Sequence, residues 1–304
     1  MIPTYNQSAF IREAIDSALG QSYSNIEVIV GDDASTDETA KLIAEINDPR
    51  LKYVRNQVNM GRVTNYRNIL YNHASGDFVV NLDGDDFYTD PDFIVEAVRL
   101  IGNDKKVVMV VARAGWEILN NVYVSNIPDV KEASGLHILK NLPDKKYLLK
   151  HMASLYNREV ALQCNFYSSN SNSSDWEGLY RLSLRGKVKY LDKKIGVWRI
   201  HDRNESATTN YHKMMDNLSI WPIIYKDSRN YGLSSISAGL NCARCVAFFA
   251  SSFATNVSVN GNKELIKFII NFFHVYKISS LLIVLTPRYA ARIILSLCGY
   301  YRKK

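Results

Sequence analysis

The segment FVVNLDGDDF, residues 78–87, places three carboxylates within four positions, directly after a short apolar run. An apolar run that ends in acidic residues and a glycine is typical of a buried strand whose carboxyl end opens into a polar loop. A second acidic pair, Asp32 and Asp33, follows another apolar run at residues 26–30. Two buried strands that both end in negative charge indicate one shared acidic site.

Helical and strand patterns alternate around these two runs. Apolar residues recur at helical spacing before Gly20, capping-box spacing opens a helix at Ser35, and a third helix ends before Gly76. The expected helices are residues 11–19, 35–46 and 62–73, and the expected strands are residues 26–30, 51–54 and 78–82. This order predicts an α/β fold with a doubly wound, mostly parallel sheet flanked by helices. Pro3 leaves two residues for a first strand if it closes that strand, so we expect native residues before Met1.

The charge of the chain is concentrated at its end. The 304 residues are 47% hydrophobic and 22% charged, which excludes a disordered chain. The net charge of +7 arises after residue 262, where eight basic residues stand against Glu264 alone. Apolar blocks separate these charges, and none reaches the ~20 residues that span a bilayer. Amphipathic helices at a membrane surface therefore fit this tail better than a nucleic-acid site does. A helical subdomain with solvated charges is the alternative.

The cysteines carry less information. Four scattered cysteines indicate a reducing compartment rather than a disulfide framework, and no signal-peptide pattern opens the chain. Cys242 and Cys245 have metal-ligand spacing, but no second pair accompanies them. We predict two thiols on one helix.

The acidic runs favour a metal site. Ligands of doubly wound sheets bind where the carboxyl ends of strands meet, so we expect both acidic groups to face one crevice. Crowded carboxylates raise each other's pKa unless a cation or hydrogen-bond donors compensate. Mg²⁺ and Mn²⁺ bind to one or two carboxylates and to substrate phosphates. A solvated acidic turn that caps a helix is the other interpretation.

Taken in order, the motifs resemble the inverting family 2 glycosyltransferases with a GT-A fold. The resemblance covers about residues 2–205 and implies a nucleotide-sugar-binding, catalytic domain over residues 1–205, with a helical, basic region at 206–304. The motifs are PTYN at residues 3–6, DDASTD at 32–37, NMG at 59–61, RN at 67–68, SGD at 75–77, DGDD at 83–86, SDW at 174–176, YLD at 190–192 and VWRIH at 197–201.

The resemblance implies a nucleotide-sugar donor, with UDP the commonest nucleotide of the family. It places Pro3 and Tyr5 at the base pocket and has Asp33 accept a hydrogen bond from the base. Asp83 would face the ribose or a metal-bound water, and Asp85 would ligate the Mn²⁺ or Mg²⁺ that bridges the diphosphate.

Three further residues are weaker assignments. Arg67 would lie near the phosphates, or would be a helix-surface arginine. His201 would approach the metal or the diphosphate, although a lone histidine is often a satisfied polar residue. Asp86 would be a third carboxylate that supports the metal ligands.

Inversion needs a base on the sugar face opposite the departing diphosphate, and Asp175 matches that position in the family. It would stand at the start of a helix, whose dipole would keep it ionised, but a helix-capping aspartate is equally physical. Glu177 is the nearest rival. The polar stretch SSNSNSS, residues 168–174, would form a mobile loop that closes over the substrates, or a plain surface connection.

These features together predict a non-processive, metal-dependent, inverting hexosyltransferase, because the Gln-x-x-Arg-Trp signature of processive members does not occur. The acceptor would be a glycan or a polyprenyl-linked lipid of surface-polysaccharide or lipopolysaccharide assembly, and the enzyme would be cytoplasmic, peripheral at the inner face of the cell membrane. The alternatives are a nucleotide-sugar-binding protein without transfer activity, a nucleotidyltransferase and a phosphatase. The latter two fit less well, since neither a glycine-rich loop nor an Asp-x-Asp motif follows the first strand.

Overall fold

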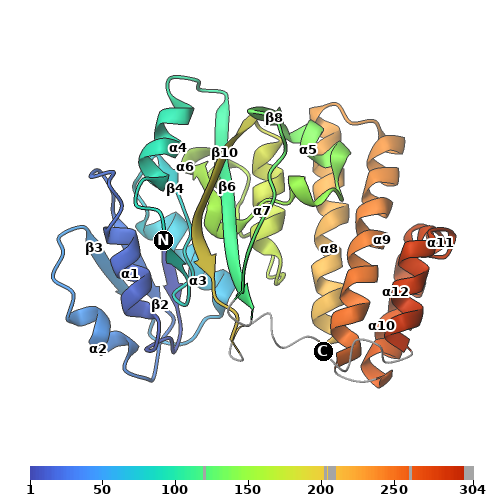
Figure 1. Ribbon diagram of the computed structural model, residues 1–304, viewed down its shortest axis with the longest axis horizontal. Helices are drawn as coiled ribbons and strands as arrows, with labels where there is room; N and C mark the ends of the chain where they lie inside the picture. The colour runs from blue at the N-terminus through green and yellow to red at the C-terminus, as the bar shows by residue number, and fades with distance from the viewer. Residues whose placement is uncertain (119–120, 202–203, 205–209, 260–261, 298–304) are drawn as a thin grey trace. The chain divides into compact units, whose positions relative to one another are not determined.

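The computed structural model describes residues 1–118, 121–201, 204, 210–259 and 262–297. The chain divides into two compact units. The first comprises Met1–Gly135, Lys145–Asn170 and Ser174–Ile200, and the second comprises Leu136–Asp144, Ser171–Ser173 and His201–Lys304. The first unit contains strands covered by helices, so the predicted α/β class is confirmed (Figure 1).

A three-stranded parallel sheet, sheet A, opens the first unit. It consists of β1 (Ile2–Thr4), β2 (Val28–Asp32) and β3 (Leu51–Arg55), in the order β1-β2-β3. Pro3 lies in register with Gly31 and does not close β1, which continues to Thr4 beside Asp32. The carboxyl ends of β1 and β2 therefore meet at one edge of the sheet.

The segment that follows β4 (Phe78–Val79) runs alongside β1. Met1 N donates to Val80 O (2.9 Å), Leu82 N donates to Met1 O (3.0 Å), and Gly84 N donates to Pro3 O (3.2 Å). The strand predicted at residues 78–82 thus has regular sheet geometry only at its start, but its remainder still bonds to β1. These bonds bring the DGDD motif to the same edge as Thr4.

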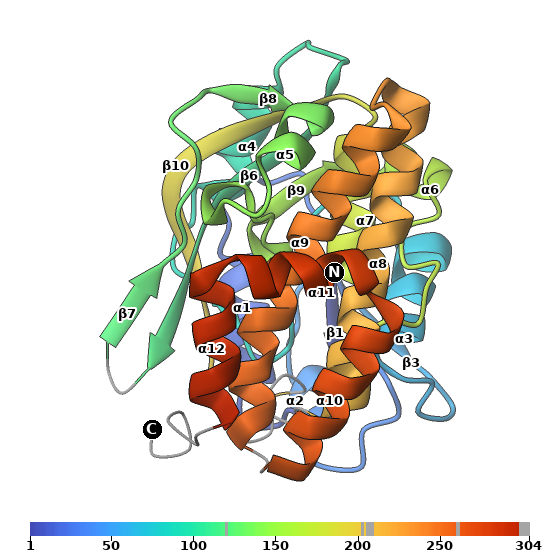
Figure 2. The same ribbon diagram turned by 90° about the vertical axis from the view of Figure 1, so that its right-hand side faces the viewer.

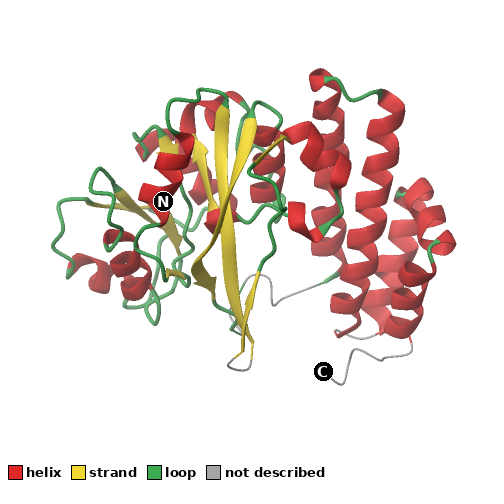
Figure 3. Cartoon of the chain, turned by 45° about the horizontal axis from the view of Figure 1, so that its top comes forward, coloured by secondary structure: helices red, strands yellow, loops and turns green. Residues whose placement is uncertain are grey.

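A larger sheet, sheet B, has the order β4-β9-β6-β10-β5. Its long strands β6 (Val107–Ile118) and β10 (Lys187–Trp198) run parallel and side by side (Figure 3). The other pairs of this sheet are antiparallel, so parallel pairing holds in sheet A and between β6 and β10. The shorter strands are β5 (Phe87–Tyr88), β7 (Asn121–Val124), β8 (Glu132–Ser134) and β9 (Ser154–Asn157).

Helices of the first unit pack on these sheets through apolar stripes. In α1 (Ile11–Leu19), Ile11, Ala14, Ile15 and Ala18 recur at helical spacing and are buried with the strands. The helix α3 (Arg62–Asn68) continues as a π-helical turn at Ile69–His73, as the pattern over residues 62–73 predicted. The other helices are α2 (Thr39–Ala44), α4 (Phe93–Ile101), α6 (Arg158–Gln163) and α7 (Ser174–Ser183).

The helix predicted to begin at Ser35 begins instead at Thr39. Ser35 Oγ accepts a hydrogen bond from Asn6 N (2.9 Å), and Thr39 Oγ1 accepts one from Gln7 N (3.0 Å). These hydroxyls therefore hold the loop after β1 rather than cap a longer helix. The capping-box prediction is wrong because a tertiary contact takes the hydroxyl group.

The second unit is helical (Figure 2). Its core is aromatic, with the Trp221 and Phe249 rings stacked at 4.8 Å and Tyr225 Oη donating to Leu139 O (2.8 Å). Cys242 and Cys245 both lie in α9, so the prediction of two thiols on one helix is confirmed, and burial raises the pKa of Cys245 to about 12. The helices are α5 (Gly135–Asn141), whose first residue belongs to the first unit, α8 (Tyr211–Ser228), α9 (Ser235–Val259), α10 (Asn262–Val275), α11 (Lys277–Leu285) and α12 (Pro287–Leu297).

One helix of the described residues is long and apolar enough by itself to cross a membrane. It is the segment Ser235–Ala254 of α9, of which 44% of the most apolar window is buried within the protein. Core helices of water-soluble proteins meet the same criterion. The pair α10 and α11 meets it only jointly and is bent by 114° at their junction.

Candidate active site

The DGDD motif forms a compact acidic cluster. Carboxylate oxygens of Asp83, Asp85 and Asp86 all lie within 4.8 Å of one another. Gly84 lets the backbone of the motif lie close to Thr4 and Gln7, since a Cβ at this position would lie 2.3 Å from Gln7 Oε1 and 2.8 Å from Thr4 Oγ1. The motif is therefore pressed against the loop that follows β1, at the carboxyl edge of sheet A.

The electrostatics of this cluster favour a cation. Burial and the charges of Asp83 and Asp85 hold the pKa of Asp86 well above its usual value, although Asp86 Oδ1 accepts a hydrogen bond from Arg199 N (2.9 Å). Burial also raises the pKa of Asp83, and Asp85 adds to that rise. Three converging carboxylates, of which Asp83 and Asp86 have raised pKa values, are a donor set that fits Mg²⁺ or Mn²⁺, because a cation would offset their mutual repulsion.

The other acidic pair does not join this cluster among the described residues. Asp32 accepts hydrogen bonds from Ser35 N (2.8 Å) and Tyr53 Oη (2.6 Å). Asp33 Oδ1 accepts from Asn56 Nδ2 (2.9 Å) and Met60 N (2.8 Å), and its Oδ2 accepts from Gly61 N (2.8 Å). Asp33 thus anchors the NMG loop, and only part of its acceptor capacity is left for a ligand.

An aromatic group that the sequence did not reveal holds Asp83. Tyr66 Oη donates a hydrogen bond to Asp83 Oδ1, and the Tyr66 ring stacks on Tyr167 with ring centres 5.1 Å apart. The Tyr167 hydroxyl lies 2.7 Å from His151 Nε2, and burial lowers the pKa of His151 to about 4. A neutral histidine and two tyrosines therefore fix one oxygen of Asp83. These three residues belong to no recognisable sequence motif, and they come from distant parts of the chain.

Asp175 lies in the first turn of α7 and is partly buried. Burial raises its pKa, while the positive charge of Arg62 and two backbone N–H groups oppose that rise. The helix terminus thus favours the ionised form, as expected, but burial outweighs it. A carboxylate with a raised pKa is a stronger base than an ordinary surface aspartate.

Arg62 was not singled out from the sequence. Its charge acts on both Asp83 and Asp175, and its guanidinium carbon lies 5.6 Å from the centre of the Tyr66 ring. The positive charge of Arg62 therefore interacts with both the acidic cluster and Asp175. Its position one residue after the NMG motif was the only available signal.

Local packing fixes the helix that carries Asp175. A Cβ at Gly178 would lie 2.6 Å from the Phe166 ring, and that ring stacks on Tyr156 at 5.0 Å. Asn165 and Tyr167, on either side of Phe166, have positive φ angles of 53° and 60°. Left-handed backbone is costly for such residues, so this turn is held by its contacts.

Glu177 is less suited to act as a base. Its carboxylate forms an ion pair with Arg181 (3.1 Å) and accepts a hydrogen bond from Ser169 Oγ (2.5 Å). Its side chain is 5% exposed. Both its oxygens are thus engaged within the protein.

The polar stretch before Asp175 is bonded to α8 of the second unit. Asp216 Oδ2 accepts hydrogen bonds from Ser171 Oγ (2.9 Å) and Asn172 N (2.8 Å). Asn217 Oδ1 accepts one from Ser173 Oγ (2.8 Å). Residues 171–173, which belong to the second unit, are therefore hydrogen-bonded to α8 within that unit. The sequence left open whether this stretch is a mobile loop or a plain surface connection.

The remaining predicted residues have varied surroundings. Pro3 is buried in β1, and Tyr5 is 45% exposed in the loop that follows. Arg67 Nη1 donates to Tyr167 O (3.3 Å), and its guanidinium carbon lies 4.6 Å from the centre of the Tyr71 ring. His201 belongs to the second unit and is not among the described residues that form the acidic cluster.

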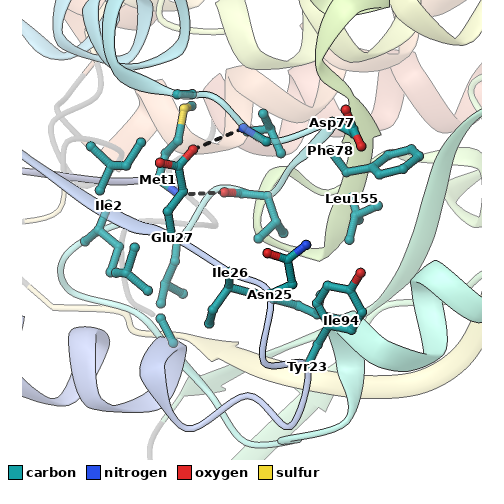
Figure 4. A pocket seen from close by; sticks show the side chains of 18 of the residues that line it. Met1, Ile2, Tyr23, Asn25, Ile26, Glu27, Asp77, Phe78, Ile94 and Leu155 are labelled. Carbon is teal, nitrogen blue, oxygen red and sulfur yellow. Dashed lines mark hydrogen bonds between the residues drawn. The ribbon is translucent and has the colours of Figure 1, made fainter. Parts of the chain in front are cut away.

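A pocket of about 650 Å³ lies at the amino-terminal ends of β1 and β2, away from the acidic cluster at their carboxyl ends (Figure 4). It is lined by the segments before and within β2 and around β4, including Tyr23, Asn25, Glu27 and Phe78. The Glu27 carboxylate accepts hydrogen bonds from Ser75 N (2.6 Å) and Gly76 N (3.1 Å). None of the residues predicted to act on the substrate lines this pocket, so it is distinct from the acidic site.

Comparisons with known proteins match one family model and several glycosyltransferases. The model of the family described as glycosyl transferase family 2 matches residues 1–163. Glycosyltransferase GlyA of Streptococcus pneumoniae is 28% identical over 203 residues, which are 64% of this chain and 26% of that protein. The GalNAc(5)-diNAcBac-PP-undecaprenol beta-1,3-glucosyltransferase of Campylobacter jejuni is 25% identical over 225 residues, 70% of this chain and 67% of that protein. The chain thus spans only part of these relatives.

A solved structure shares the fold. It is S. aureus TarS 1-349 in complex with UDP-GlcNAc, with a TM-score of 0.64 at 17% identity, and the match covers 99% of this chain and 89% of that one.

Proposed function

The chain belongs to glycosyl transferase family 2, and on that premise we propose that it is a metal-dependent, inverting, non-processive glycosyltransferase. It moves one sugar from a UDP-sugar to a hydroxyl group of a glycan or a lipid-linked acceptor. The observation that carries this proposal is the convergence of Asp83, Asp85 and Asp86 within 4.8 Å, at an edge where a family 2 chain would hold its donor.

The acidic cluster would hold the cation through Asp85, with Asp83 toward the ribose or a metal-bound water. Mn²⁺ or Mg²⁺ there would neutralise the negative charge of the departing diphosphate. Tyr66 keeps one oxygen of Asp83 occupied, so only the other oxygen faces the donor. Asp86 stays beneath the site, where Arg199 N holds it.

The nucleotide would lie over the loops that follow β1 and β2. Asp33 fixes Met60 and Gly61 and accepts a hydrogen bond from the base with the capacity that remains. Tyr5 is exposed enough to stack on the base. Pro3 supports this wall from within β1.

Two cations near the site have different roles. The positive charge of Arg62 acts on both the acidic cluster and Asp175, which suits a contact with the diphosphate. Arg67 is the weaker phosphate candidate, because its guanidinium already bonds to Tyr167 O and lies over Tyr71. His201 remains a secondary candidate for the diphosphate or the metal.

Asp175 takes the proton of the attacking hydroxyl group. As the acceptor oxygen bonds to the anomeric carbon and the bond to the diphosphate breaks, that proton moves to an oxygen of the Asp175 carboxylate. Attack from the face opposite the leaving group inverts the anomeric configuration. The raised pKa of Asp175 makes this late transfer more favourable, and the engaged Glu177 is disfavoured in the role.

The acceptor is proposed to be lipid-linked and the enzyme to work at the inner face of the cell membrane. The name of the Campylobacter relative contains an undecaprenol-linked acceptor, and the basic region 206–304, whose described residues are mostly helical, would place the chain at such a surface. UDP is proposed because the S. aureus protein of the same fold was solved with UDP-GlcNAc.

A thermal-shift screen of nucleotide sugars with and without Mn²⁺ tests the proposal. A UDP-sugar is expected to raise the melting temperature only when metal is present, because ligands that bind the folded state stabilise it. The selected donor is then offered with glycan and undecaprenyl-linked acceptors, and the anomeric configuration of the product is determined. Donor binding without any transfer or nucleotide release would instead identify a binding protein.

A further inference from the structure

Two helices of the second unit are apolar on both sides. In α10, Leu265, Phe268 and Phe272 are buried within the unit. On its other side, Ile266 and Ile270 are 47% and 63% exposed. A helix that only covers a core has one apolar stripe and one polar face, so the second stripe of α10 requires another explanation.

The same pattern continues in α11, with more exposure. Ile283 is buried. Ile278, Leu281 and Val284, each three residues after the last, are 67%, 59% and 61% exposed. Within each helix these side chains are about one turn apart, and neighbouring exposed apolar side chains, unlike scattered ones, mark a surface that another body covers. We call this set the docking face: Ile266, Ile270, Phe273, Ile278, Leu281, Val284 and Leu285.

The two helices are too short and too bent to cross a bilayer as one straight span. The 14 residues of α10 extend about 21 Å and the 9 residues of α11 about 14 Å, against about 30 Å of hydrocarbon. They meet at 114°, and Figure 2 shows α11 running across the direction of α10 and α12. Such a pair fits a surface on which it lies.

Exposed basic residues lie at the starts of the helices that carry or follow the docking face. Lys277 is the first residue of α11 and Arg288 lies in the first turn of α12, and both are exposed. Lys263, in the first turn of α10, is exposed as well. From residue 262 onward the one acidic residue is Glu264, which forms an ion pair with Lys267 (2.9 Å). The covering body is therefore expected to be anionic.

We propose that the docking face lies in the headgroup region of an anionic lipid bilayer, with Lys263, Lys277 and Arg288 at the lipid phosphates. Apolar side chains framed by basic residues are the pattern of helices that lie in the interface plane. This inference rests on the proposed function for its purpose, since a lipid-linked acceptor would be presented at that surface. Its test requires neither donor nor acceptor.

The test is co-sedimentation of the full chain with vesicles. We expect binding to vesicles of phosphatidylcholine and phosphatidylglycerol (3:1), weak binding to pure phosphatidylcholine, and weaker binding at high salt. Leu281→Asp should lower the partition coefficient about tenfold or more. The double variant Lys277→Glu and Arg288→Glu should lower it at least about 25-fold, since each basic residue near an anionic surface contributes about fivefold.

Val130→Asp is the matched control, because Val130 is 43% exposed but lies in the first unit. It should bind vesicles as the wild type does. The proposal is overturned if the folded wild type does not sediment with anionic vesicles, or if Val130→Asp loses as much binding as Leu281→Asp. It is also overturned if light scattering shows a dimer that Leu281→Asp dissociates, because a second copy would then cover the docking face.

The metal-dependent thermal shift with UDP is measured on the same samples. A wild type that does not bind vesicles but shows the full shift refutes the membrane assignment and leaves the proposed metal-dependent donor site standing. Vesicle binding without any metal-dependent shift refutes the proposed function alone.

Discussion

Replacing Asp85 with asparagine should abolish the stabilisation by metal and nucleotide without unfolding the protein. Asparagine has nearly the shape of aspartate, so the packing around this buried side chain is kept. The variant also loses a charge that raises the pKa of Asp83 and Asp86. The metal-free variant should therefore be at least as stable as the metal-free wild type.

The size of the effect follows from ligand linkage. At a UDP and Mn²⁺ concentration 100 times the dissociation constant, the folded wild type gains about 2.7 kcal/mol. Unfolding of all 304 residues in one step has an entropy of about 0.6 kcal/mol/K, so the melting temperature should rise by about 4 °C. If the first unit, about three fifths of the chain, unfolds by itself, the rise should be about 7 °C.

Differential scanning calorimetry with Mn²⁺ and UDP, and with EDTA and UDP, measures this rise. Asp129→Asn is the control, because the Asp129 side chain is 89% exposed and pairs with Lys146, outside the acidic cluster. The control should show the full wild-type rise and Asp85→Asn should show none. An Asp85→Asn protein that keeps the full rise would refute the assignment of the metal to this cluster.

Three other perturbations test neighbouring residues. The pKa of Asp86 is raised in the folded state, so this group stabilises the metal-free protein below about pH 4, and that stabilisation is lost as the pH rises through the folded-state pKa. Calorimetry from pH 4 to 8 should therefore show a steeper loss of stability in the metal-free wild type than in Asp86→Asn. Equal slopes in the two proteins would contradict the raised pKa of Asp86. Tyr66→Phe removes the hydrogen bond to Asp83 and should weaken Mn²⁺ binding by about 10- to 100-fold, as titration calorimetry would measure. An unchanged Mn²⁺ affinity would mean that Tyr66 does not orient Asp83. Asp216→Ala removes the hydrogen bonds to Ser171 and Asn172 and should lower transfer by up to about 10²-fold, while the metal-dependent thermal shift with UDP stays at its wild-type size. Transfer at the wild-type rate would show that these hydrogen bonds do not support the catalytic reaction.

The acidic cluster was predictable because its residues are adjacent in sequence. Asp83, Asp85 and Asp86 follow an apolar run, and backbone bonds to β1 place any residues there at the sheet edge. The need for a glycine between them follows from the same contact with Thr4. Local sequence therefore specifies both the chemistry and the place of this group.

The support of the cluster was not predictable. Tyr66, His151 and Tyr167 meet only through the tertiary fold, and an aromatic letter in a helix or a loop is usually a core residue. Helix α2 was mispredicted for the same reason, since Ser35 bonds to Asn6 N across the sheet edge. Sequence patterns locate groups that act through neighbours in the chain, whereas these residues act through neighbours in space.

The most direct test of the central claim measures nucleotide release from the selected UDP-sugar, with acceptor and Mn²⁺, for the wild type, Asp175→Asn and Glu177→Gln. We predict that Asp175→Asn loses about 10²- to 10⁴-fold in turnover while its metal-dependent stabilisation by the donor remains at the wild-type value, and that Glu177→Gln retains turnover. Wild-type turnover by Asp175→Asn would contradict the account.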